Sequence, residues 1–89
     1  MSRGYRNGVG ELAPKLTLPS SYQQRLRIAL AEIEEAPSVE SCRLAKQLAI
    51  GLVGGLELAR ALEPERIERL FILVDDVAAA RLLALGEIG

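Results

Sequence analysis

Apolar residues recur at intervals of three and four positions along three segments of this 89-residue chain. That spacing places them on one side of an α-helix, with polar residues on the other side. The pattern predicts amphipathic helices over residues 20–36, 38–62 and 64–85. Because the connections between them are short, we expect an all-α fold, a small up-down-up three-helix bundle.

The first helix is predicted to begin at Ser20 or Ser21, each of which has a glutamine three residues later, as in a capping box. Pro37 should end it, because the residue before a proline avoids the helical conformation. This helix should contribute one side of the core through Tyr22, Leu26, Ala29, Leu30 and Ile33.

Ser38 should cap the second helix, in which three glycines, Gly51, Gly54 and Gly55, pose a difficulty. Each glycine inside a helix costs up to about 1 kcal/mol relative to alanine. A break at Gly54-Gly55 would give four helices, but the apolar stripe keeps its phase across the glycines, which favours one continuous helix. The predicted stripe is Cys42, Ala45, Leu48, Ala49, Leu52, Leu56 and Ala59.

The third helix has the strongest periodic signal in the chain. Pro64 suits its first turn and Gly86 should stop it. Its main stripe is Ile67, Leu70, Phe71, Val74, Val77, Ala78, Leu82 and Leu85.

A second set of residues on the third helix lies outside that stripe: Ile72, Leu73, Asp76, Ala79, Ala80 and Leu83. A helix that is apolar on two sides is either enclosed in a larger core or docked on another molecule. With only two other helices in the chain, we expect these residues to form a protein interface. The alternative is that scattered leucine and alanine on a surface need no explanation.

Residues 1–19 are predicted to form an extended, basic N-terminal arm, since three glycines and two prolines prevent a regular helix there. The bundle domain should then span residues 20–86, followed by a short tail over residues 87–89.

The charge is uneven although the net charge is only −1. Residues 1–30 carry five basic groups and one acid, whereas the remainder carries six basic groups and eleven acids. Arginines beside an aromatic ring can follow a phosphate backbone while the ring stacks on a base. Nucleic-acid binding through the arm, extended by Arg25 and Arg27, is therefore an alternative to protein docking or to no role for the arm. The candidate arm contacts are Arg3, Tyr5, Arg6 and Lys15.

The residue inventory argues against catalysis. There is no histidine to serve as a general base or metal ligand, and Cys42 is the only cysteine. One thiolate cannot close a zinc site, and no glycine-rich phosphate loop is present. Adjacent helical residues diverge by about 100°, so Asp75 and Asp76 should not share a proton or a metal. We expect no enzyme activity, no metal site and no cofactor.

Two features of the helices have competing interpretations. Gly51 and Gly55 have the spacing that lets two helix backbones approach closely, but tight packing inside the bundle or a turn is the preferred explanation. Arg81 falls within the core stripe of the third helix. It either pairs with a carboxylate, such as Glu34, Glu35 or one on a partner, or, as we favour, reaches from the edge of the core to water.

A lone cysteine, no apolar leader and no membrane-spanning stretch predict a cytoplasmic protein. Nine arginines to two lysines, with abundant alanine, leucine and glycine, suggest a bacterial genome rich in GC or one of its mobile elements.

A core of about seventy residues is near the lower limit for independent stability, so a partner is the expected supplement. We therefore expect a non-catalytic protein–protein binding module, a small adaptor, inhibitor or regulator, acting through an apolar helical face. A homo-oligomer is one form of it.

Overall fold

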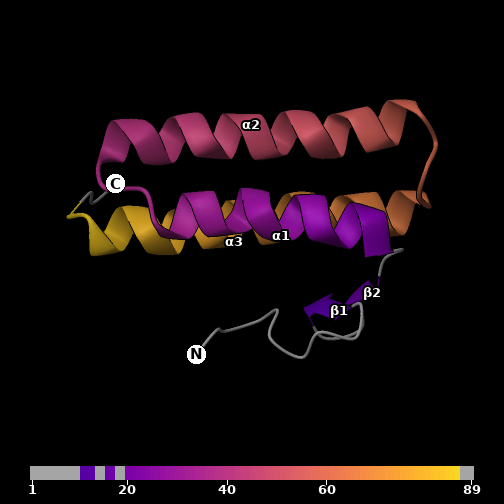
Figure 1. Cartoon of the computed structure of the whole chain (residues 1–89), viewed down its shortest axis with the longest axis horizontal. Helices are drawn as coiled ribbons and strands as arrows, with labels where there is room; N and C mark the ends of the chain where they lie inside the picture. The colour runs from indigo at the N-terminus through magenta and orange to yellow at the C-terminus, as the bar shows by residue number, and fades with distance from the viewer. Residues whose placement is uncertain (1–10, 14–15, 18–19, 87–89) are drawn as a thin grey trace.

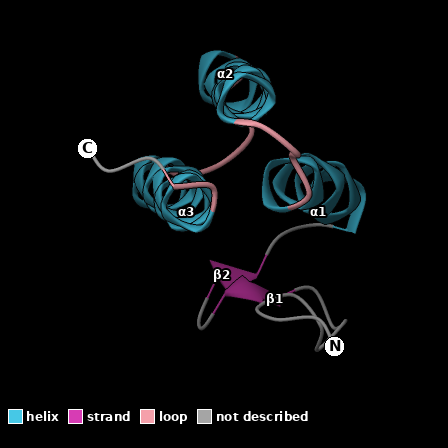
Figure 2. Ribbon diagram, turned by 90° about the vertical axis from the view of Figure 1, so that its left-hand side faces the viewer, coloured by secondary structure: helices cyan, strands magenta, loops and turns pink. Residues whose placement is uncertain are grey.

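The computed structural model describes residues 11–13, 16–17 and 20–86, and its main feature is a bundle of three helices. The helices are α1 (Ser20–Glu34), α2 (Val39–Leu58) and α3 (Pro64–Ala84). They run alternately up, down and up and form a triangle when viewed along their axes (Figures 1 and 2). The predicted all-α three-helix bundle is confirmed.

Helix α1 begins at Ser20, as its sequence predicts, and its regular part ends at Glu34. The turn that follows is tighter, because the amide of Ala36 donates to the carbonyl of Ile33 at 3.2 Å. Pro37 then directs the chain into α2. The side chain of Gln23, three residues after Ser20, is buried.

Helix α2 has the N-cap that its sequence predicts. The Ser38 hydroxyl accepts the Ser41 amide at 3.1 Å, and the Ser41 hydroxyl accepts the Ser38 amide at the same distance. The reciprocal pair satisfies two amides that the first turn of a helix leaves without partners. The helix then runs unbroken through Gly51–Gly55, so the prediction of one continuous helix is confirmed.

The carboxyl end of α2 is closed by a reversal of the backbone at Arg60. Arg60 has a positive φ of 55°, and its amide donates to the carbonyl of Glu57 at 3.0 Å. The amide of Ala61 reaches back to Leu56 at 3.0 Å. These two bonds form a Schellman motif, which ends helices and is usually built on glycine.

Helix α3 starts at Pro64, which occupies the first turn, where its missing amide has no intrahelical bond to lose. Its regular part ends at Ala84, and Gly86, whose φ of 96° is accessible to glycine at little cost, follows the C-cap residue Leu85. Both ends agree with the sequence prediction.

The core lies along the axis of the bundle and is almost entirely aliphatic. Its buried hydrophobic residues are Leu26, Leu30, Ile33, Ala36, Cys42, Ala49, Val53, Ile67, Leu70, Val74 and Ala78. Tyr22 and Ala29 of α1 and Phe71, Val77, Leu82 and Leu85 of α3 pack around it, half-buried. The predicted stripes of α1 and α3 are therefore confirmed.

The predicted stripe of α2 is partly wrong. Leu48 and Ala59 are exposed, whereas Val53, absent from the prediction, is fully buried. Leu48 and Ala49 are adjacent and so point about 100° apart, and a helix with only two neighbours cannot bury both. The inward side of α2 is centred on Ala49 and Val53.

A short antiparallel pair of strands, β1 (Glu11–Ala13) and β2 (Leu16–Thr17), precedes the helices. It lies on the side of the bundle away from α2, and β1 approaches α1 (Figure 2). The other arm residues, including the candidate contacts Arg3, Tyr5, Arg6 and Lys15, and the tail over residues 87–89 lie outside the described residues.

Candidate protein-binding surfaces

The predicted interface on α3 is largely exposed, and it is mixed in character. Ile72 and Leu83 are 52% and 69% exposed, with Asp76, Ala79 and Ala80 exposed between or beside them. Leu73 differs, because it is half-buried and packs against the core. The outward side of α3 therefore offers two large apolar side chains separated by an acid and small residues.

A shallow hollow of about 360 Å³ adjoins this side of α3, where α3 lies beside the end of α1. Three of the residues that line it are charged, Glu34, Asp76 and Arg81. The others are Val77, Ala80 and Ala84. A hollow with two acids and a guanidinium in its wall is not a site for a purely apolar ligand.

A more continuous apolar surface lies on the outward side of α2, which the sequence reasoning did not select as an interface. Leu44 and Leu48 are each 62% exposed, and Leu58 is 87% exposed. Gly51 and Gly55, both exposed, lie between them. We call the set Leu44, Leu48, Gly51, Gly55 and Leu58 the α2 stripe.

The α2 stripe is defined by alternating steps of four and three residues, a heptad spacing that keeps side chains on one line along a helix. It lies roughly opposite Ala49 and Val53, which face the core. No Asp, Glu, Lys or Arg occurs between Lys46 and Glu57. This heptad spacing can be seen in the sequence and indicates an outward apolar stripe. It was missed because the sequence analysis placed Leu48 in the core.

The glycines of the α2 stripe serve no packing purpose inside the bundle. A Cβ atom placed on Gly51 or Gly55 would meet no heavy atom within 4 Å. Both glycines lie within a regular helix, so neither marks a turn. The preferred sequence interpretation, tight packing within the bundle or a turn, is therefore wrong.

The α2 stripe continues sideways into a second shallow hollow, of about 350 Å³, between α2 and the end of α1. The hollow is lined by Glu32, Glu35, Ala36, Pro37, Ser41, Leu44, Ala45 and Leu48. The two leucines that it shares with the α2 stripe make one apolar surface with a rim of acids on α1.

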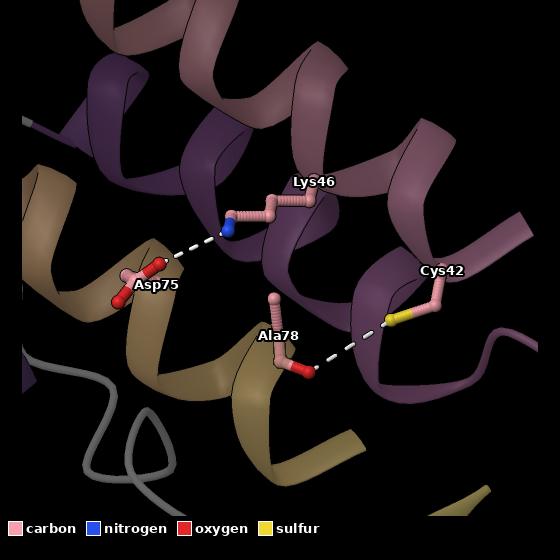
Figure 3. A network of polar contacts seen from close by, with 4 residues as sticks. All are labelled: Cys42, Lys46, Asp75 and Ala78. Carbon is pink, nitrogen blue, oxygen red and sulfur yellow. Dashed lines mark hydrogen bonds and ion pairs between the residues drawn. The ribbon is translucent and has the colours of Figure 1, made fainter. Parts of the chain in front are cut away.

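Charged residues lie at the two ends and one edge of α2. Glu40 and Arg43 are exposed near its amino end, and Glu57 and Arg60 are exposed at its carboxyl end. At the edge facing α3, Lys46 Nζ lies 3.0 Å from a carboxylate oxygen of Asp75 (Figure 3). Asp75 therefore takes part in an ion pair between two helices.

Arg81 makes a contact that neither sequence interpretation named. Its Nε and Nη2 atoms donate to the main-chain carbonyl of Ala36, in the turn after α1, at 2.9 and 2.7 Å. The side chain is half-buried, so it lies at the edge of the core as favoured, but its guanidinium is held by a main-chain carbonyl. Its position at the end of α1 also places a positive charge where a helix dipole favours one.

Cys42 is fully buried, and its Sγ lies 4.0 Å from the carbonyl oxygen of Ala78 (Figure 3). A buried thiol in such surroundings acts as a small apolar residue. Among the described residues, no group of three or more cysteine, aspartate or glutamate side chains could hold a metal ion.

The basic residues proposed to contact nucleic acid are only partly displayed. Arg25 is exposed on α1, whereas Arg27 is half-buried.

Within residues 11–13, 16–17 and 20–86, no helix has the length and apolar content needed to cross a membrane.

No family model, curated protein or solved structure matches this chain.

Proposed function

We propose that the chain is a non-catalytic protein-binding module, a small adaptor, inhibitor or regulator, that binds through an apolar helical face. The observation that supports this proposal is the α2 stripe, in which three leucines are more than half exposed along one side of one helix. Contiguous apolar surface of this kind is typical of interaction sites, whereas single exposed leucines are not.

Binding at this face follows the helix-in-groove mode, in which residues one helical turn apart insert together into an apolar partner surface. Transfer of Leu44 and Leu48 from water into such a surface contributes roughly 1.5–3 kcal/mol for each side chain that becomes fully buried. The acids on the rim, Glu32 and Glu35, favour a partner with basic residues at the matching positions.

The outward side of α3 is a second surface within this proposal. Ile72 and Leu83 are exposed, as an interface there requires, but Asp76 lies between them. Burying an aspartate without a partner is costly. We therefore give α2 the main role and α3 the lesser one.

The free, buried Cys42 is compatible with a reducing compartment, and the proposal places the module in the cytoplasm.

The test is affinity capture from the native host with the full chain as bait, with and without nuclease. The variant Leu48→Arg should lose the captured protein, because a charge would enter the centre of the apolar face. Gln24→Arg is the matched control, since it adds the same charge at an exposed position of α1. Unchanged capture by Leu48→Arg would refute binding through α2. Capture that depends on nuclease-sensitive material would instead favour nucleic-acid binding.

A further inference from the structure

We infer that the α2 stripe pairs antiparallel with the α2 stripe of a second copy of this chain. The inference rests on the proposed function, since it identifies the partner of the same face. A symmetric dimer requires a surface that is complementary to itself, in both shape and charge. The α2 stripe meets both conditions.

The shape condition is met by the order of leucines and glycines. When two α2 helices run antiparallel, one alignment sets Leu44 opposite Gly55 of the second copy and Leu48 opposite Gly51 of the second copy. The two-fold axis repeats both pairs, so four successive layers each join a large residue with a glycine. Such alternation fills space, whereas parallel helices in register would set leucine on leucine and leave gaps between glycines.

This arrangement explains why glycine occupies positions 51 and 55 within a helix. Each costs up to about 1 kcal/mol inside a helix, and the open space around Gly51 and Gly55 shows that the isolated bundle has no need of them. Without Cβ atoms, the two helix backbones can approach until each leucine contacts the facing main chain. From Leu44 to Leu58 the stripe is about 21 Å long at 1.5 Å per residue, enough for several such layers.

The charge condition is met at the ends of α2. The same antiparallel alignment brings Glu40, which lies close to the line of the α2 stripe, toward Arg60 of the second copy, so that an opposite-charge pair forms at each end. Both residues are exposed. A parallel alignment would instead place each charge beside its own copy, so charge as well as shape selects the antiparallel pair.

The described part of the chain leaves this face open to a second copy. The strands β1 and β2 lie on the opposite side of the bundle, below α1 and α3 in Figure 2. The leucines of the α2 stripe are accordingly exposed in the single chain.

The first experiment is sedimentation velocity of the purified full chain over a range of concentrations. The expected mass rises from 9.6 kDa toward twice that value. Leu48→Arg should hold the protein at the mass of one chain, while circular dichroism shows an intact helical fold. Ile72→Arg is the matched control on α3 and should still form the dimer. A wild-type mass of one chain at every concentration would overturn the inference, as would loss of the dimer in Ile72→Arg alone.

Two further variants test the geometry of the pair. Gly51→Ala should raise the Tm of the bundle yet weaken association at least tenfold, because its methyl group would separate the helices. Glu40→Arg should weaken association, and adding Arg60→Glu should restore it if the helices run antiparallel. Association unaffected by Gly51→Ala, or no restoration by the second charge change, would refute the proposed packing.

Failure of self-pairing can be told apart from failure of protein binding. If the wild-type chain is a monomer but Leu48→Arg loses a protein captured from the host, the α2 stripe binds a different protein and only the self-pairing is refuted. If the chain is a monomer and capture is unchanged, both proposals are wrong.

Discussion

The guanidinium of Arg81 donates two hydrogen bonds to one main-chain oxygen, the carbonyl of Ala36. The contact joins the last turn of α3 to the turn that follows α1, across a sequence separation of 45 residues. Pro37 follows Ala36, so this carbonyl lies where regular helical hydrogen bonding has stopped. Arg81 supplies the donors that the interrupted helix lacks.

Replacing Arg81 by methionine should therefore lower the free energy of unfolding by about 1–3 kcal/mol, since a carbonyl in a partly buried turn loses charged donors. Urea unfolding followed by circular dichroism measures the change. Arg25→Met is the control, because Arg25 is exposed on α1, and it should stay within about 0.5 kcal/mol of the wild type. Equal effects of the two substitutions would contradict a structural role for the Arg81 contact.

The inward side of α2 makes a second prediction. Val53→Ala should cost about 2 kcal/mol, because it removes buried methyl groups and leaves a small cavity. Leu48→Ala, measured in dilute solution, should cost less than about 0.5 kcal/mol, although it removes a larger side chain. Chemical denaturation of both variants decides the point, and a greater loss for Leu48→Ala would place that leucine in the core.

Glycine has opposite effects at two positions. Gly86 has a φ of 96°, so Gly86→Ala should destabilise the protein by about 1 kcal/mol. Gly54 lies within α2, and a Cβ atom added there would meet no heavy atom within 4 Å, so Gly54→Ala should stabilise the protein by up to about 1 kcal/mol. Thermal unfolding should show Tm shifts of opposite sign, and shifts of the same sign would disagree with the described backbone.

The burial of Cys42 predicts slow chemistry at its thiol. A thiol reagent should modify Cys42 only as fast as the native state opens, because the side chain has no exposure to solvent. Gln47→Cys, at an exposed position of the same helix, should react at once and serves as the control. Immediate modification of Cys42 in the folded wild-type chain would contradict its position in the core.

The helices could be predicted from the sequence because their ends depend on neighbouring residues. Ser38 with Ser41, Pro64 and Gly86 each act within one turn of chain. The buried sides of α1 and α3 could also be predicted, because their large apolar residues recur at helical spacing on one side.

The residues that α2 buries could not be predicted from the sequence in the same way. Its apolar residues surround the helix, and only the positions of the other two helices decide that Val53 is buried and Leu48 is not. The partner of Arg81 was hidden for a related reason. Every residue has a main-chain carbonyl, so the sequence pattern does not indicate which one accepts a hydrogen bond. The carboxylates proposed as partners of Arg81 therefore did not include Ala36.

The exposed glycines Gly51 and Gly55 also affect how the native state fluctuates. Each glycine lowers the stability of the helix around it, so this part of α2 should open more readily than its neighbours. Hydrogen exchange should therefore be faster here than at Ala49 or Val74. Any molecule that covers the α2 stripe would slow that exchange, so these amides give a direct signal of occupancy at the face that we propose to be functional.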